Sequence, residues 1–167
     1  VGVSGNTGSR PQRNEAGESP CLTRAEIDFS QVRGHNAAVD AVALAAAGGH
    51  HLMLIGEPGS GKTMIASRIP SILPALSESD ALTASAIHSL AGDLPAGGLL
   101  DHAPFQSPHH SMSIPAMVGG GSSCIRPGAV SLAHGGVLFL DEATEFAPAV
   151  LDSLRQPIES GWVRIQR

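Results

Sequence analysis

The sequence predicts an α/β fold in which helices flank a parallel sheet. Residues 51–55 form a short apolar run suited to a buried parallel strand, and a glycine-rich turn and a helical pattern follow it directly. A second apolar run, residues 136–140, ends in two carboxylates. A helical pattern that closes on two glycines precedes the first run. This order of helix, strand, loop and helix is typical of an α/β sheet, and parallel strands follow from it.

Length and composition limit the possibilities. The 167 residues are enough for one domain with its own core. No apolar run approaches the ~18 residues of a membrane span, and the N-terminus does not resemble a signal peptide, so we expect a cytoplasmic protein without a membrane partner. The formal net charge of -5 gives no overall electrostatic signature of nucleic-acid binding. Cys21 and Cys124 are expected to be free thiols without an assigned role.

The N-terminal stretch differs from the rest of the chain. Residues 1–25 are rich in Gly, Ser, Asn, Pro and Arg and show no apolar period, which is the composition of a linker or disordered tail. The folded domain is therefore expected to cover residues 26–167. Within residues 28–49, Val39, Val42 and Ala46 recur at helical spacing, and Gly48 with Gly49 marks the end of that helix.

The glycine-rich turn fits the phosphate-binding pattern G-x-x-x-x-G-K-[ST] without a mismatch. The matching residues are Gly56, Glu57, Pro58, Gly59, Ser60, Gly61, Lys62 and Thr63. Such a turn directs backbone N–H groups at phosphate oxygens. Lys62 is expected to reach the β- and γ-phosphates of ATP, and the Thr63 hydroxyl is expected to bind Mg²⁺. Lys62 is also the only lysine in the chain, which argues against a chance match.

Two helices and a long irregular segment are predicted after the glycine-rich turn. Residues 63–69 read as a helix that Pro70 ends or kinks. Ser77 and Asp80 resemble a capping box, Leu82, Ala86 and Leu90 give a helical stripe, and Gly92 should close this second helix. Residues 92–136 are rich in Gly, Pro, Ser and His and too long for a plain loop in a compact domain. An insertion or a functional loop is therefore expected there.

The second apolar run supplies the other half of a nucleotide site. Asp141 and Glu142 directly follow the apolar run of residues 136–140, which is the Walker B pattern of a P-loop ATPase. Because the carboxyl ends of parallel strands share one edge of the sheet, Asp141 should lie beside the P-loop and hold Mg²⁺ directly or through water. Glu142 is expected to act as the general base that deprotonates the attacking water, so Lys62 and Glu142 are the predicted catalytic residues.

Other chemistries are less well supported. His109, His110, His134 and Cys124 lack the spacing of a zinc site. A serine hydrolase is disfavoured because no G-x-S-x-G elbow occurs. Trp162 follows a turn, where a single aromatic side chain is expected to serve packing.

These motifs together resemble the magnesium-chelatase-like AAA+ ATPases, specifically the YifB/ComM branch. The resemblance covers residues 28–167 and rests on residues 28–35, 45–50, 56–63 and 104–146. Its most specific strings are P-F-x-x-P-H-H at residues 104–110 and R-P-G-x-x-S-L-A-H-x-G-V-L-F-L-D-E at residues 126–142. His35 stands where this family has Gln beside the adenine pocket, and Ala143 and Thr144 stand where it has Leu-Pro. The resemblance also suggests that the His-His segment lies near the nucleotide or a neighbouring subunit.

The resemblance also implies what this chain lacks. The family's sheet has the strand order five, one, four, three, two, and the chain is expected to lack the fourth and fifth strands, the helical lid, both sensors and the arginine finger. Asp141 is therefore not expected to be held firmly at Mg²⁺ distance from Thr63. The family implies a homo-hexamer that uses ATP to drive DNA branch migration in recombination and natural transformation. The alternatives are a chelatase-like subunit that drives metal insertion by remodelling, and a truncated nucleotide-binding chain without activity.

Overall fold

The structure, a computed structural model, describes residues 28–95, 97–121 and 125–164. The linker expected at residues 1–25, together with Cys21 and Cys124, lies outside these ranges. Strands β1 (Phe105–Gln106) and β2 (Val137–Leu138) form a two-stranded parallel sheet with Phe105 opposite Val137. A mixed α/β fold with parallel strands is therefore confirmed, although β2 is shorter than the predicted run of residues 136–140.

The two strands pack closely where β2 begins. The backbone N–H of Val137 donates to the carbonyl of Pro104 at 2.9 Å, and the N–H of Phe139 donates to the carbonyl of Gln106 at 2.8 Å. A Cβ atom on Gly136 would lie 2.0 Å from the Pro104 carbonyl oxygen. Only glycine therefore allows this approach of the two backbones.

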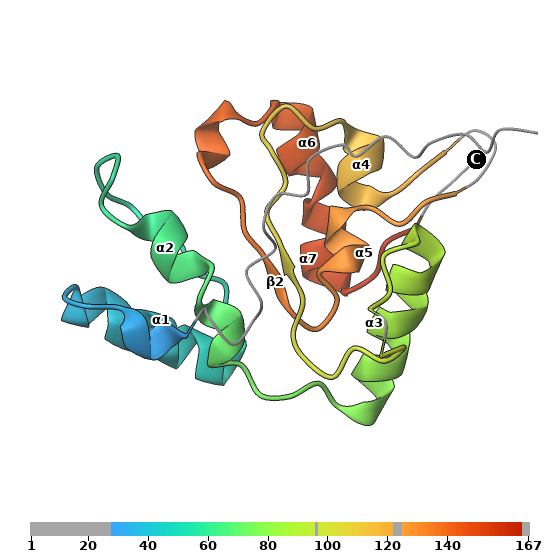
Figure 1. The fold of residues 1–167 in the computed structure, drawn as a ribbon. Coiled ribbons are helices and arrows are strands. Elements are labelled where there is room, and N and C mark those ends of the chain that lie inside the picture. Colours follow the sequence, from blue (N-terminus) through green and yellow to red (C-terminus); the bar gives the residue numbers. More distant parts are fainter. Residues whose placement is uncertain (1–27, 96, 122–124, 165–167) are drawn as a thin grey trace, which may run out of the picture.

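One flank of the sheet carries the first helices (Figure 1). They are the 3₁₀ turn η2 (Phe29–Gln31), α1 (Asn36–Gly48), α2 (Lys62–Ala66) and the 3₁₀ turn η3 (Ile69–Ser71). Phe29, Val42 and Ile65 form their shared core. Gly49 ends α1 in the left-handed conformation, as the two glycines predicted. The helix predicted over residues 63–69 breaks after Ala66, and Pro70 lies inside η3.

Turn η2 begins with a side-chain cap. The carboxylate of Asp28 accepts a 2.6 Å hydrogen bond from the Ser30 backbone N–H. Hydrogen bonds from the side chain and backbone of Ser30 lower the pKa of Asp28. This cap fixes the start of η2, where the described part of the chain begins.

The strand predicted at residues 51–55 is not formed. Residues 51–57 have no regular secondary structure, and no segment in the described part of the chain pairs with them. Leu54 packs on the first core, but the side chains of Met53 and Ile55 are 78% and 87% exposed. A strand needs a neighbour to bond its N–H and C=O groups, and the structure supplies none here. The apolar pattern indicated a burial that the described part of the chain does not provide.

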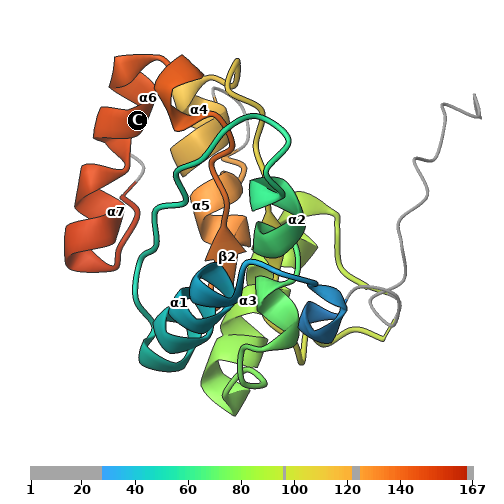
Figure 2. The same cartoon turned by 90° about the vertical axis from the view of Figure 1, so that its left-hand side faces the viewer.

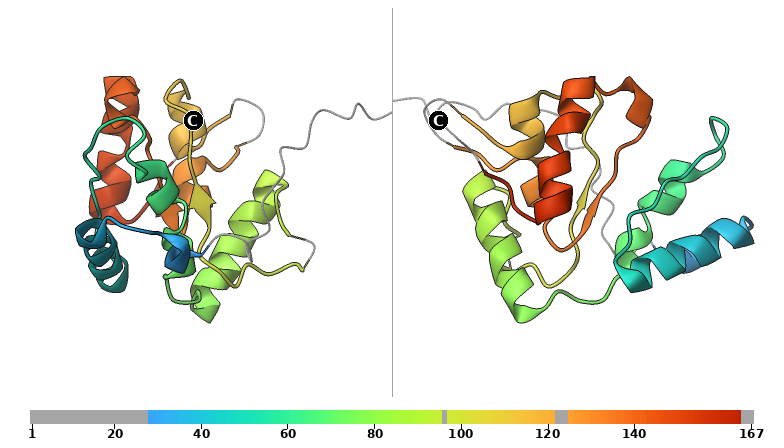
Figure 3. Two further views of the ribbon diagram at one scale, coloured as in Figure 1. Left: turned by 60° about the vertical axis from the view of Figure 1, so that its left-hand side comes forward. Right: turned by 180° about the vertical axis from the view of Figure 1, so that it is seen from behind.

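Helix α3 (Glu78–Ala91) lies on the opposite flank of the sheet, as two further views show (Figures 2 and 3). Its predicted ends are confirmed: the Ser77 hydroxyl accepts from the Asp80 N–H at 3.2 Å, and Gly92 closes the helix with φ 79°. Its predicted apolar stripe is wrong, because Leu82 and Leu90 are exposed.

The buried face of α3 consists of Ala81, Ala84, Ser85 and His88. Two polar contacts fix this orientation. The Ser85 hydroxyl accepts from the Leu100 N–H at 2.8 Å, and Nε2 of His88 lies 3.0 Å from the Leu132 carbonyl oxygen. Satisfied buried polar groups therefore decide the face of α3, and the leucine pattern does not.

Residues 92–136 form more than a plain loop, in line with the prediction. Besides β1, they contain α4 (Ile114–Val118), α5 (Ala129–Leu132) and an isolated antiparallel bridge between Gly120 and Arg126. After β2 come the 3₁₀ turn η4 (Ala143–Glu145), α6 (Pro148–Ser153) and α7 (Arg155–Ser160). Helices α4 to α7 stand together over the sheet (Figure 1). Their common core consists of Met117, Ala129, Phe146, Val150 and Leu154.

Trp162 does not pack in the way the sequence predicted. Its side chain is 74% exposed just beyond α7. The turn before it is present, because Gly161 takes a left-handed conformation with φ 71°. No described segment covers the indole after this turn.

Candidate functional site

The glycine-rich loop wraps around the side chain of Lys62. Gly59 and Gly61 have φ of 76° and 83°, a region in which glycine carries no steric penalty. The Lys62 ammonium donates to the carbonyl oxygens of Gly56 and Glu57, both at 2.9 Å. Lys62 is also the first residue of α2, so the motif ends where this short helix begins. The loop is thus held closed around its own cation.

A cavity of about 280 Å³ opens beside this loop. Its lining consists of His35, Ala38, Leu54, Ile55, Gly56, Ser60, Lys62 and Ile65. His35 begins α1 in the left-handed conformation with φ 53° and reaches the same cavity as Lys62. The position that the family resemblance placed near adenine is therefore next to the phosphate-binding motif. Apolar walls with a few polar groups suit a nucleobase and its sugar.

Thr63 and Asp141 meet directly. The Thr63 hydroxyl donates a 2.7 Å hydrogen bond to Oδ2 of Asp141. The expectation that Asp141 would not be firmly held near Thr63 is therefore wrong. The link between the two motifs is a side-chain hydrogen bond, and it needs no strand between the P-loop segment and β2.

Glu142 follows with an unusual backbone. Its φ of 49° places a non-glycine residue in the left-handed region, which costs energy and occurs often at functional sites. The Glu142 N–H donates to Oδ1 of Asp141 at 3.0 Å. Asp141 thus accepts one hydrogen bond on each carboxylate oxygen, from Thr63 and from Glu142.

The oxygens of Thr63 and Asp141 fit a Mg²⁺ ion. Neighbouring ligands of an octahedral Mg²⁺ at 2.0–2.1 Å stand about 2.9 Å apart, close to the 2.7 Å between Oγ1 and Oδ2. In the described ranges no group of three His, Cys, Asp or Glu side chains could enclose a metal. A hydroxyl, one carboxylate and the oxygens of a bound phosphate match the way Mg²⁺ is bound in phosphoryl-transfer sites.

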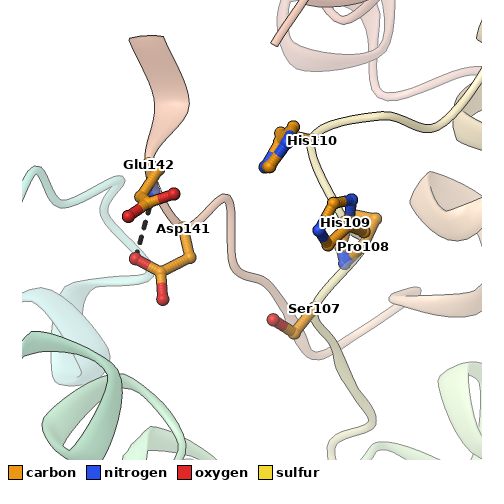
Figure 4. A pocket seen from close by; sticks show the side chains of 6 residues that line it. All are labelled: Ser107, Pro108, His109, His110, Asp141 and Glu142. Atoms are coloured by element: carbon orange, nitrogen blue, oxygen red, sulfur yellow. Dashed lines mark hydrogen bonds between the residues drawn. The ribbon is translucent and has the colours of Figure 1, made fainter. Parts of the chain in front are cut away.

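A second cavity, of about 350 Å³, lies beside the two carboxylates. Figure 4 shows Asp141 and Glu142 on one side of it and Ser107, Pro108, His109 and His110 on the other. The second group directly follows β1, and the first lies just beyond β2. Because parallel strands end at the same edge, the pairing of β1 with β2 brings the two groups together.

The structure therefore joins the two predicted motifs through one contact, Thr63 to Asp141, with a cavity on each side of it. Lys62 lines the cavity beside the glycine-rich loop, and the His-His segment lines the other cavity with Asp141 and Glu142. The family resemblance placed the His-His segment near the nucleotide or a neighbouring subunit, but sequence reasoning gave neither histidine a chemical role. The signal available was their position directly after a strand, but β1 is only two residues long and carries no periodic pattern.

No helix in the described part of the chain is long and apolar enough to cross a membrane.

Comparison with known proteins gives one family. The family model described as "Magnesium chelatase, subunit ChlI" matches residues 28–167. The YifB protein of Escherichia coli K12 is 51% identical over 159 residues, which cover 95% of this chain and 30% of that protein. The competence protein ComM of Haemophilus influenzae is 45% identical over 141 residues, covering 84% of this chain and 28% of ComM.

A protein of Mycobacterium tuberculosis H37Rv is 49% identical over 169 residues, which cover 99% of this chain and 32% of that protein. The chain thus spans about a third of the length of these relatives.

Proposed function

The chain belongs to the magnesium chelatase subunit ChlI family and is similar to YifB and ComM, and from this premise we propose that it is the ATP-binding part of an ATPase. In this proposal residues 26–167 are the N-terminal part of the AAA+ domain. ATP binds at residues 56–63, with Thr63 and Asp141 as the Mg²⁺ ligands. Glu142 is the general base.

The contact between Thr63 and Asp141 carries this proposal. Either motif by itself could be a structural turn, but the two meet at 2.7 Å through groups that suit Mg²⁺. Lys62 supports it from the other side, because its ammonium is already aimed into the loop. The contact joins the end of the glycine-rich loop to the segment after β2, which supports the roles proposed for Lys62, Thr63 and Asp141.

The proposed mechanism uses mainly positioning and charge. The Lys62 ammonium exchanges its bonds to the Gly56 and Glu57 carbonyls for bonds to the β- and γ-phosphates. Mg²⁺, once bound, neutralises the charge that develops on those phosphates. Glu142 takes a proton from the water that attacks the γ-phosphorus, while the bond between that phosphorus and the bridging oxygen breaks and ADP leaves.

The same premise suggests what hydrolysis drives. We propose a homo-hexamer that uses ATP to promote branch migration of DNA in recombination, as in natural transformation. The similarity to a competence protein supports this choice, as does the P-F-x-x-P-H-H string. Remodelling for metal insertion is the second candidate, which the family description favours. The two candidates can be distinguished with the protein encoded by the longest reading frame that contains this chain. ATP-dependent unwinding of a branched DNA by that protein would favour branch migration over remodelling for metal insertion.

A binding measurement tests the core of the proposal. Titration of a fluorescent ATP analogue into this chain with Mg²⁺ should show binding that Lys62→Ala weakens roughly 10- to 150-fold, because hydrogen bonds to charged groups contribute about 1.5–3 kcal/mol. Arg155→Ala is the matched control, since Arg155 is exposed and pairs with Asp152 at 3.1 Å on α6. Equal affinity of the wild-type and Lys62→Ala chains would refute the nucleotide assignment.

A further inference from the structure

Two hydrogen bonds tie η2 to the segment that follows α2. The Phe29 backbone N–H donates to the Ser71 hydroxyl at 3.0 Å, and this hydroxyl donates to the Arg68 carbonyl at 2.8 Å. The Arg68 guanidinium donates from Nη2 to Oε1 of Gln31 at 3.3 Å and from Nη1 to the Met64 carbonyl at 2.9 Å. Arg68 therefore holds η2 against α2, the helix into which the glycine-rich loop leads.

Between η2 and α1 the chain takes two consecutive left-handed residues. Gly34 has φ 75° and His35 has φ 53°, and only the glycine adopts this conformation without a steric penalty. Such strain persists where the surrounding structure holds the residue from both sides. On one side α1 holds His35, because the N–H groups of Ala38 and Val39 donate to its carbonyl at 2.8 and 3.0 Å. On the other side the preceding element is η2.

Folding stability does not explain the surroundings of Arg68. Its Nε is buried without a hydrogen-bond partner in the described ranges, and no described carboxylate pairs with the guanidinium. A buried donor without a partner costs free energy, which an apolar side chain of similar shape would avoid. The Met64 carbonyl would keep a donor without Arg68, because the Ser67 hydroxyl donates to it at 3.0 Å. An unsatisfied group retained beside a candidate binding site points to a functional role.

We propose that Arg68 is a positioning residue for nucleotide binding, which latches η2 to α2 and thereby keeps His35 at the wall of the cavity beside Lys62. This inference rests on the proposed function and adds a residue that does not touch the ligand. Arg68 lines neither of the two cavities, so it acts only through η2 and His35. Loss of the latch releases residues 33–35 from the left-handed turn, and only the molecules that keep the turn bind the base side of ATP at full strength.

Two ligands separate the base side of the site from its phosphate side. Arg68→Met keeps most of the apolar stem and removes every donor. Isothermal titration of this chain with Mg²⁺ should show about tenfold weaker binding of ATP to Arg68→Met than to the wild type. Binding of inorganic tripolyphosphate, which has no base, should be unchanged, because the glycine-rich loop and Lys62 are left as they are.

Three further variants sharpen the titration. Arg68→Lys should recover part of the loss, because an ammonium group can donate to one of the two acceptors. Ser71→Ala removes the other hydrogen bond between η2 and this segment, and it should also weaken ATP but not tripolyphosphate. Arg155→Met is the same change at an exposed arginine of α7, which pairs with Asp152 at 3.1 Å, and it should bind both ligands like the wild type.

Hydrogen exchange and urea unfolding test the latch without any ligand. In Arg68→Met the amides of Phe29, Gln31 and Val32, all hydrogen-bonded in or beside η2, should exchange about tenfold faster. Amides of α3 on the opposite flank should exchange as in the wild type. The free energy of unfolding should stay the same or rise, because the unsatisfied Nε is gone. A purely structural role would instead lower stability and speed exchange throughout the chain.

The outcomes for this inference and for the proposed function can be told apart. Equal weakening of ATP and tripolyphosphate, or exchange in η2 that Arg68→Met leaves unchanged, refutes the latch. ATP binding that requires Lys62 but is the same in Arg68→Met refutes this inference alone. ATP binding that does not require Lys62 refutes the nucleotide assignment, and the role of Arg68 in binding falls with it.

Discussion

The Thr63 hydroxyl donates a 2.7 Å hydrogen bond to Oδ2 of Asp141, joining residues 78 positions apart in the chain. Thr63 belongs to α2, and Asp141 lies just beyond β2. The two elements belong to different cores, one built on Val42 and Ile65 and the other on Met117 and Phe146. The hydrogen bond thus connects two separately packed parts at the point where Mg²⁺ and a phosphate would bind.

Loss of either partner should remove the Mg²⁺ dependence of ATP binding. Thr63→Ala removes a proposed oxygen ligand of Mg²⁺, and Asp141→Asn removes the charge of the other. Mutation of residues that merely hydrogen-bond to metal ligands lowers metal affinity by about 10–100-fold. We therefore expect the Mg²⁺ affinity of the nucleotide complex to fall at least tenfold in each variant. Fluorescent ATP analogue titrations with Mg²⁺ and with EDTA measure this.

Two variants provide the controls for this prediction. Thr63→Ser keeps the hydroxyl and should bind like the wild type. Thr83→Ala removes an exposed hydroxyl that donates to the Ser79 carbonyl on α3, and it should have no effect. If Thr63→Ala retains the full difference between Mg²⁺ and EDTA, Thr63 does not bind the metal.

Glu142→Gln should separate binding from hydrolysis. Glutamine has the same size as glutamate but cannot take a proton, so we expect ATP affinity to stay the same. In the protein encoded by the longest reading frame that contains this chain, turnover should fall by a factor of about 10²–10⁴. Phosphate release and filter-bound ATP report the two quantities. Glu145→Gln, three residues further in η4, is the matched control. Wild-type turnover in Glu142→Gln would exclude Glu142 as the base.

The sequence predicted which residues meet at this site better than it predicted the structure around them. Phosphate- and Mg²⁺-binding motifs are defined by residue types at fixed spacings, so residues 56–63, Asp141 and Glu142 could be picked out without a fold. The helix ends at Gly49, Ser77 and Gly92 were also predictable, because capping is local.

Features that depend on distant partners could not be read in this way. Residues 51–55 have a strand pattern, but a strand forms only where another strand bonds to it. The buried face of α3 is set by hydrogen bonds of Ser85 and His88 to residues 100 and 132, which periodicity does not reveal. The placement of residues 107–110 across a cavity from Asp141 and Glu142 depends on the pairing of β1 with β2, and a two-residue strand leaves no pattern in the sequence.

Gly136→Ala should destabilise the fold. Its Cβ would lie 2.0 Å from the Pro104 carbonyl oxygen, so the start of β2 must move away from residue 104. Overpacking of this kind costs about 1–3 kcal/mol, and the free energy of unfolding from urea titration measures it. Gly97→Ala is the control, because its Cβ would meet nothing within 4 Å. A Gly136→Ala chain as stable as Gly97→Ala would show that β1 and β2 do not approach this closely.

The 167 residues by themselves should not hydrolyse ATP appreciably, although both motifs are present. In oligomeric ATPases an arginine from a neighbour can contribute ~10³–10⁵ in rate. Among the residues that the structure describes, no arginine lines either of the two cavities beside Lys62 and Asp141. Residues 51–55, which lead into the P-loop, also have no strand partner in the described part of the chain. Exposed Met53 and Ile55 indicate that this segment is weakly held, which should misplace the phosphates relative to Glu142.

Phosphate release by the purified chain should therefore equal that of its Lys62→Ala variant, even where the two differ in ATP binding. The comparison removes background from contaminating ATPases, because both chains are purified in the same way. Addition of Mg²⁺ should not raise phosphate release, since the missing contribution is the arginine of a neighbouring subunit and not the metal. ATP turnover by the purified chain that requires both Lys62 and Mg²⁺ would contradict this prediction. It would show that the 167 residues hold the site rigidly enough for hydrolysis without an arginine from a partner.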